Sequence, residues 1–140
     1  MFENMFSSKK PKQESINHKI LIVDDNEIQR RIIQTTLEKA GYATVQAENG
    51  EIGLEMAKRE NPDMIFLDCQ MPVMDGITMC KRLKENDSLK KVPVIFLTAL
   101  DTPRNIIDCF EVDAENYLSK PISPKILLQQ VQATLEEKQK

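Results

Sequence analysis

The sequence lacks a C-x-x-C motif, a second histidine and a long apolar run, and each absence excludes a class of protein. Cys69, Cys80 and Cys109 are odd in number and show no C-x-x-C spacing, so we interpret them as reduced thiols rather than disulfides or zinc ligands. His18 has no second histidine to share a metal with and is expected at the surface. No apolar run approaches the roughly 20 residues of a transmembrane helix, which predicts no membrane insertion.

An excess of positive charge and a signal peptide are also missing. The 19 basic and 22 acidic residues give a net charge of -3, which predicts no direct binding to nucleic acid. The first residues have a short apolar stretch with lysines after it, whereas a secretory signal peptide has its positive charges before a longer apolar stretch. We therefore expect a cytoplasmic protein.

The length and the pattern along the chain predict one domain after a flexible arm. A chain of 140 residues has room for one core but not for a second folded domain. Residues 1–18 are polar and without a sustained period, so we expect an N-terminal arm, with the folded domain at 19–140. Phe2, Met5 and Phe6 could dock a partner, but the composition favours a plain tail.

Strands and helices alternate along the domain. Apolar runs at 20–23, 64–67 and 94–97 are typical of strands buried on both faces, while 43–47 and 116–119 are more mixed and suit the margins of a sheet. Apolar residues recur at helical spacing between these segments. Helix boundaries are indicated by Gly41, Asn61-Pro62, Asp75, Thr102-Pro103 and Ser123-Pro124, and the last helix should direct four side chains inward: Leu127, Leu128, Val131 and Leu135.

Five repeats of strand and helix predict the fold class. Right-handed crossovers place the strands in a parallel sheet covered on both faces. We expect an α/β, doubly wound, five-stranded parallel sheet of order 2-1-3-4-5, the flavodoxin-like (βα)5 arrangement. Ligands of such sheets bind beyond the carboxyl ends of the strands, where the strand order reverses.

Polar residues stand at four of these strand ends: Asp24 and Asp25, then Asp68, Thr98 and Lys120. Three carboxylates brought together repel one another unless cations offset them, which a divalent metal and Lys120 would do. Oxygen ligands favour Mg2+, or Mn2+, over zinc. Asp68 is the candidate nucleophile toward a phosphoryl group, whose charge the metal and Lys120 would spread while Thr98 donates a hydrogen bond.

Each of these residues also has a simpler interpretation. The pair Asp24-Asp25 alone could cap the first helix, and Asp75 is best explained as the cap of the third. Lys120 could be a solvated loop lysine, and Tyr117 a half-buried strand aromatic. The site is favoured because all of its members fall at strand ends of one sheet.

Four segments, taken in order, resemble the signature of response-regulator receiver domains, the chemotaxis-regulator-like modules of two-component phosphorelay signalling. The resemblance covers residues 19 to 138, and the segments are Ile20-Leu21-Ile22-Val23-Asp24-Asp25-Asn26, residues Leu67 to Gly76, Phe96-Leu97-Thr98-Ala99 and Tyr117-Leu118-Ser119-Lys120-Pro121.

The resemblance implies phosphorylation of Asp68. It implies that Asp25 binds Mg2+ directly, that Asp24 binds it mostly through water, and that the backbone carbonyl of Gln70 is a further ligand. Thr98 and Lys120 would contact the phosphoryl group. The Lys120-Pro121 peptide bond is expected to be cis.

The resemblance also implies an output. Thr98 would move toward the phosphoryl oxygens and Tyr117 would turn inward, which changes the surface made by the fourth helix, fifth strand and fifth helix. Gln70 and Leu100 predict slow self-dephosphorylation, because neither can activate a water. The sequence departs from the family at Asp113, where a glycine is common.

The expected partners are a sensor histidine kinase or histidine phosphotransfer protein, a downstream effector protein and, on phosphorylation, a second copy of the chain. The chain would be no enzyme beyond catalysing its own phosphorylation and dephosphorylation. A phosphatase of the haloacid-dehalogenase type is the first alternative, but Gln70 stands where its second acid is needed. A passive docking module is the second, and the acidic pair, threonine and lysine argue against it.

Overall fold

The computed structural model describes residues 18–99, 107–108 and 111–139. Their strands form one parallel sheet of order β2-β1-β3-β4-β5, which confirms the predicted flavodoxin-like arrangement. The five strands are β1 Lys19–Val23, β2 Ala43–Ala47, β3 Met64–Asp68, β4 Val94–Thr98 and β5 Asn116–Ser119.

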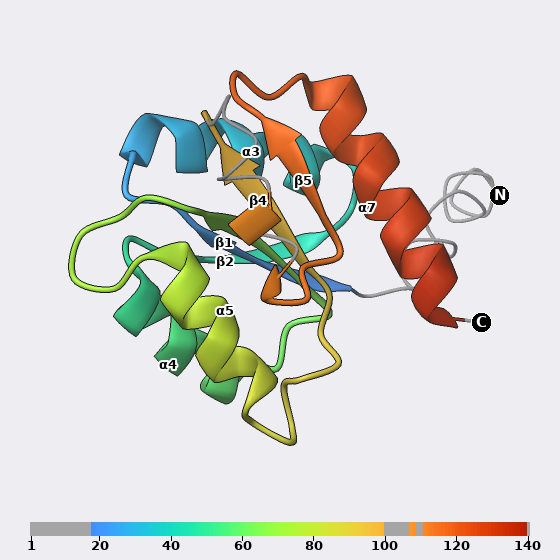
Figure 1. The fold of residues 1–140 in the computed structure, drawn as a ribbon. Helices are drawn as coiled ribbons and strands as arrows, with labels where there is room; N and C mark the ends of the chain where they lie inside the picture. The colour runs from blue at the N-terminus through green and yellow to red at the C-terminus, as the bar shows by residue number, and fades with distance from the viewer. Residues whose placement is uncertain (1–17, 100–106, 109–110, 140) are drawn as a thin grey trace, which may run out of the picture.

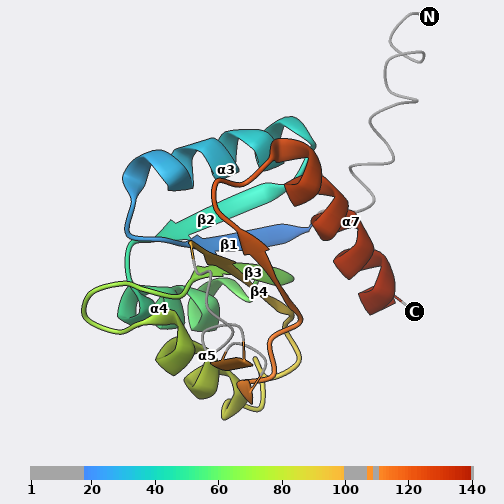
Figure 2. The ribbon, with the colours of Figure 1, turned by 45° about the horizontal axis from the view of Figure 1, so that its top comes forward.

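Helices cover both faces of the sheet. They are α3 Glu27–Lys39, α4 Gly50–Glu60, α5 Gly76–Lys84 and α7 Pro124–Gln139. Figures 1 and 2 show α3 and α7 on one face and α4 and α5 on the other. None of these helices is long and apolar enough to cross a membrane. Residues 1–17 of the predicted arm and the predicted start of a helix at Thr102-Pro103 lie outside the described residues, and so do Leu100 and Cys109.

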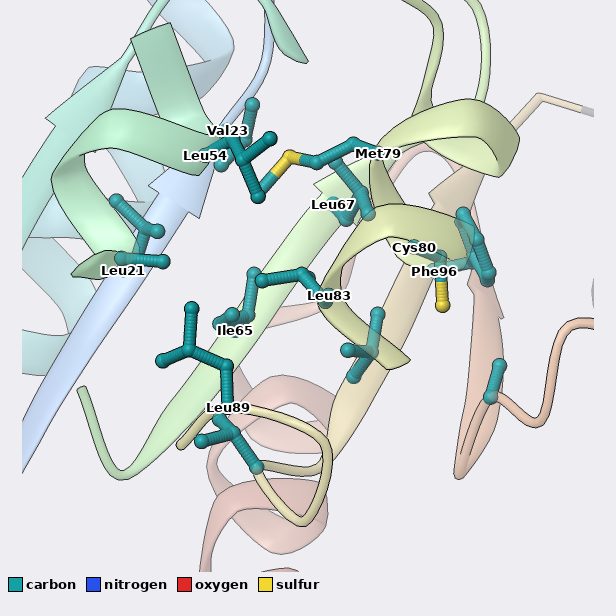
Figure 3. Close-up of a cluster of buried hydrophobic side chains, with 14 of the residues drawn as sticks. Leu21, Val23, Leu54, Ile65, Leu67, Met79, Cys80, Leu83, Leu89 and Phe96 are labelled. Atoms are coloured by element: carbon teal, nitrogen blue, oxygen red, sulfur yellow. The ribbon is translucent and has the colours of Figure 1, made fainter. Parts of the chain in front are cut away.

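Alternation along the strands divides the core into two clusters. Side chains of successive strand residues point to opposite faces. On one face Leu21, Ile65 and Phe96 pack with α4 and α5, as Figure 3 shows. On the other face Ile22 and Phe66 pack with α3 and α7. Every residue of β3 and β4 is buried, as predicted, whereas β2 and β5 are partly exposed at the margins.

The predicted helix boundaries are mostly explained by side-chain caps. Asp75 Oδ1 accepts the amide of Thr78 at 2.8 Å and begins α5, which confirms its assignment as a cap. Ser123 Oγ accepts the amide of Ile126 at 3.4 Å and begins α7, and Gly41 has a φ of 100° just after α3. In α7, Leu127, Val131 and Leu135 are buried and Leu128 is half-buried.

The apolar pattern of α3 does not all face the core. Ile33 and Leu37 are buried, but Ile28 is 72% exposed and Ile32 is 48% exposed. A helix on the outside of a sheet buries one stripe only. The spacing therefore predicted the helix but could not show which of its isoleucines are covered.

Val73, in the loop between β3 and α5, has a strained backbone. Its φ is 70°, and the amide of Met74 donates to the carbonyl of Pro72 at 2.7 Å, which closes a γ-turn around Val73. A left-handed backbone costs an L-residue roughly 1 to 2 kcal/mol. We predict that Val73→Gly raises the free energy of unfolding by about 0.5 to 1 kcal/mol, because glycine's greater unfolded entropy offsets part of the relief.

Urea unfolding of wild type, Val73→Gly and Val73→Ala checks this prediction. The side chain is 74% exposed, so little packing is lost in either variant. Val73→Ala keeps a Cβ and should gain less than Val73→Gly. A glycine variant less stable than the alanine variant would show that the turn carries no such strain.

Candidate functional site

The carboxyl ends of β1 and β3 bring three carboxylates together. Side-chain oxygens of Asp24, Asp25 and Asp68 all lie within 4.8 Å of one another. Lys120, which follows β5, places its Nζ 3.0 Å from Oδ2 of Asp24 and 3.5 Å from Oδ2 of Asp68. Lys120 is thus an ion-pair partner of this cluster, and not a solvated loop lysine. The structure brings these four predicted site residues into one place.

Asp24 is fixed by its neighbours and is fully buried. Its amide donates to the carbonyl of Ala47 at 3.1 Å, which extends the β1–β2 ladder by one residue. Its Oδ1 accepts the amide of Asn26 at 2.9 Å. Asn26 itself caps α3 by accepting the amide of Gln29 at 2.9 Å. The capping interpretation of the acidic pair is therefore wrong, since Asn26 performs that role.

Asp68 is placed by the end of β3 and by a close backbone approach. Its side chain accepts the amide of Gln70 at 3.4 Å, and its exposure is 6%. The amide of Gly76 donates to the carbonyl of Cys69 at 2.9 Å. A Cβ at Gly76 would overlap the carbonyl oxygen of Asp68, so only glycine allows α5 to begin this near the carboxylate.

Thr98 and Tyr117 lie on one face of the sheet. Phe96 pairs with Tyr117 and Thr98 pairs with Ser119 in the β4–β5 ladder, and residues two apart on a strand share a face. Thr98 is 1% exposed, whereas Tyr117 is half-buried against the core cluster that includes Phe96. The two predicted switch residues are therefore linked through the packing of one face.

The loop after β5 holds Lys120 beside Thr98. The amide of Lys120 donates to the carbonyl of Thr98 at 2.8 Å, and the Lys120-Pro121 peptide bond is cis, as expected. Gln70 is exposed in the loop after β3. Asp113, which stands where relatives commonly have glycine, has a φ of 65° and so adopts a conformation that favours glycine.

Burial and charge change the titration of the cluster. Burial, followed by the repulsion of Asp24, raises the pKa of Asp68 from 3.8 to about 6, and Lys120 offsets only part of this. Burial acts to lower the pKa of Lys120, but its contacts with Asp24 and Asp68 outweigh burial and raise that pKa above 10.5. The raised pKa of Asp68 indicates that Lys120 supplies too little positive charge to offset burial and the repulsion of Asp24.

The raised pKa of Asp68 predicts a pH dependence of stability without metal. Because the folded state holds this proton more tightly than the unfolded state, the contribution of Asp68 to stability is fully present below about pH 4 and is lost as pH rises through about 6. Lys120 keeps its charge throughout this window. Asp68→Asn should remove the fall and raise the free energy of unfolding at pH 7 by about 2 to 3 kcal/mol.

Urea unfolding between about pH 4 and pH 8 in the presence of a chelator measures this effect. Asp75→Asn is the matched control, because Asp75 is an exposed cap in the same loop region and asparagine caps equally well. Parallel pH curves for wild type and Asp68→Asn would contradict the prediction.

The donor set fits a hard divalent cation. All three acidic side chains offer oxygen, the ligand atom that magnesium and manganese prefer. Oδ2 of Asp24 is buried and receives no well-directed hydrogen bond within the described part of the chain, although the Lys120 ammonium lies 3.0 Å away. The cluster could therefore hold a metal ion.

One side chain near the cluster was missed by the sequence argument. Arg30, on α3, donates to the backbone carbonyl of Asp24. The available signal was a basic residue five and six positions after the acidic pair, at the spacing that turns a helical side chain back toward the preceding loop. By contrast, Cys69 and Cys80 are buried, and His18 is half-buried near Asp63, at the other end of β1.

Known proteins are similar to this chain in sequence. The family described as "Response regulator receiver domain" matches residues 20–132. The alkaline phosphatase synthesis transcriptional regulatory protein PhoP of Bacillus subtilis is 38% identical over 120 residues, which cover 86% of this chain and 49% of PhoP. Response regulator PleD of Caulobacter vibrioides is 38% identical over 115 residues, which cover 82% of this chain and 25% of PleD. The chain thus spans half or less of these relatives.

A solved structure shows the same likeness. The chemotaxis protein CheY4 of Vibrio cholerae superposes with a TM-score of 0.80 at 32% identity, covering 84% of this chain and 98% of that one. In a doubly wound sheet ligands bind at the switch point of the strand order, which is where this acidic cluster lies. The chain belongs to the response-regulator receiver family, whose members are phosphorylated on an aspartate in two-component signalling.

Proposed function

We propose that the chain accepts one phosphoryl group on Asp68 from a sensor histidine kinase or a histidine phosphotransfer protein, with Mg2+ bound. The proposal rests on one cluster: three carboxylates, those of Asp24 and Asp68 buried and that of Asp25 exposed, whose oxygens lie within 4.8 Å, with the Lys120 ammonium 3.0 and 3.5 Å from the two buried ones. Such an arrangement is costly for stability unless a cation offsets the carboxylates.

The residues have separate roles in this proposal. Asp24, Asp25, Asp68 and the carbonyl of Gln70 would hold Mg2+, with Mn2+ as a substitute. The bound ion supplies positive charge to the transferring oxygens. An oxygen of Asp68 attacks phosphorus in line, the bond from phosphorus to the donor's imidazole nitrogen breaks, and that nitrogen keeps the electron pair.

Two further side chains stabilise the transferred group. Lys120, already paired with Asp68 at 3.5 Å, remains beside the charge that develops on the phosphoryl oxygens. Thr98 ends the neighbouring strand β4 and would donate its hydroxyl hydrogen to one of those oxygens. The chain thereby catalyses only its own phosphorylation and dephosphorylation.

The signal would leave through β5 and its neighbours. Movement of the Thr98 hydroxyl empties space on the face that Tyr117 shares, and Tyr117 is half-buried there. A downstream effector would read the changed surface of β5, α7 and the helix predicted to begin at Thr102-Pro103, and a phosphorylation-dependent homodimer is an alternative reader. Direct DNA binding is not proposed, although PhoP is a transcriptional regulator. The cytoplasmic location stays a prediction from the sequence.

Labelling by acetyl phosphate, followed by intact mass spectrometry, tests the proposed function. We expect a gain of one phosphoryl group that requires Mg2+ or Mn2+ and is lost on chelation. A passive docking module would stay unlabelled under every condition. A phosphatase of the haloacid-dehalogenase type would instead release inorganic phosphate continuously from a phosphomonoester, which would refute the proposal.

A further inference from the structure

Arg30 joins the turn after β1 to the neighbouring strand. Its Nη1 donates to the backbone carbonyl of Asp24 at 2.6 Å, and its Nε donates to Oε1 of Gln46 at 3.3 Å. Gln46 lies on β2, where it is the ladder partner of Ile22. The guanidinium of this α3 residue therefore contacts both the turn after β1 and strand β2. The Arg30 side chain is partly buried.

The other contacts of Asp24 show what the hydrogen bond from Arg30 contributes. Its amide is bound by the carbonyl of Ala47, and its Oδ1 by the amide of Asn26. With Arg30 on the carbonyl, Oδ2 remains as the oxygen that faces Lys120. The carbonyl of Asp24 and the amide of Asp25 belong to one rigid peptide plane. Fixing that carbonyl therefore also fixes the direction in which the chain enters Asp25.

We infer that Arg30 is a positioning residue that holds the Asp24-Asp25 peptide in the orientation required at the metal site. The inference rests on the proposed function, because it concerns the binding of Mg2+. Removing a residue that orients a metal ligand without binding the metal itself typically weakens metal binding about 10- to 100-fold. A guanidinium can direct two donors at fixed angles, whereas the lysine ammonium acts as a point charge.

Titration calorimetry with MgCl2 tests the role on the whole chain. We expect Arg30→Met to bind Mg2+ about 10- to 100-fold more weakly than wild type, and Arg30→Lys to recover only part of the loss. Arg31→Met is the matched control. Arg31 is the next residue on the same helix, is exposed, and pairs with Glu27 at 3.1 Å, so this variant removes the same charge without touching the turn.

A second readout needs no metal. The amides of Asp24 and Asn26 are both hydrogen-bonded, and their hydrogen exchange should become faster in Arg30→Met but not in Arg31→Met. Gln46→Leu, which removes only the second anchor, should give a smaller change in the same direction. This measurement reports the positioning of the turn by itself.

The outcomes separate the inference from the proposed function. Equal Mg2+ affinities in Arg30→Met and Arg31→Met, or full recovery in Arg30→Lys, would show that only charge matters and would overturn the positioning role. Unchanged exchange at Asp24 and Asn26 would overturn it as well. A wild type that binds no Mg2+ would refute the proposed metal site, while the exchange rates would still decide whether Arg30 holds the turn.

Discussion

Replacing Asp68 by asparagine is expected to abolish phosphorylation by acetyl phosphate. The amide nitrogen and oxygen of asparagine have no negative charge with which to attack phosphorus. The shape is nearly unchanged, and the metal-free fold should become more stable because the burial and the repulsion that raise the pKa of Asp68 no longer act on a charged group. Loss of label in this variant therefore reports lost chemistry and not lost structure.

The control for this result is Asp75→Asn. Asp75 lies in the same connection between β3 and α5 but caps the helix, and asparagine preserves that cap. It should be labelled at the wild-type rate within about twofold. A stoichiometric label on Asp68→Asn would move the acceptor elsewhere and would contradict the mechanism.

Removing both other acids is expected to eliminate Mg2+ binding. In the variant Asp24→Ala with Asp25→Ala, two of the three carboxylates of the cluster are gone, and Mg2+ is normally held by one or two protein carboxylates. We expect the affinity for Mg2+ to fall by more than about 100-fold. Asp68 should then be labelled extremely slowly at any Mg2+ concentration that the wild type needs.

Calorimetry with MgCl2 and circular dichroism on the same samples measure binding and fold together. Glu51→Ala with Glu55→Ala is the matched control, because both residues are exposed on α4 and the change in net charge is equal. The control should bind Mg2+ like the wild type. Unchanged affinity in the double aspartate variant would place the metal at other residues.

The fold could be predicted because the apolar residues follow clear strand and helix patterns along the sequence. The three apolar runs are typical of strands covered on both faces, and β1, β3 and β4 occupy the centre of the sheet. Helix starts were indicated by residues whose side chains cap the helix, such as Asp75 and Ser123. Local chemistry and global topology agree at these positions.

The residues of the site could be predicted from the sequence, but the residue that holds them in place could not. Asp24, Asp68 and Lys120 follow strands that the topology must bring together. Arg30 was missed because its contact is to a backbone carbonyl, and the spacing of a basic residue after the acidic pair is a weak signal for such a contact. The exposure of Ile28 and Ile32 also depends on how α3 is rotated against the sheet, and apolar spacing alone does not fix that rotation.

The site of the phosphoryl group tests the central claim most directly. After acetyl phosphate treatment with Mg2+, borohydride reduces an aspartyl phosphate to homoserine, and peptide mass spectrometry then finds the altered residue. We predict homoserine at position 68 alone, in wild type and in Asp75→Asn. Homoserine at position 24 or 25, or a stable phosphoryl group on His18, would contradict the account.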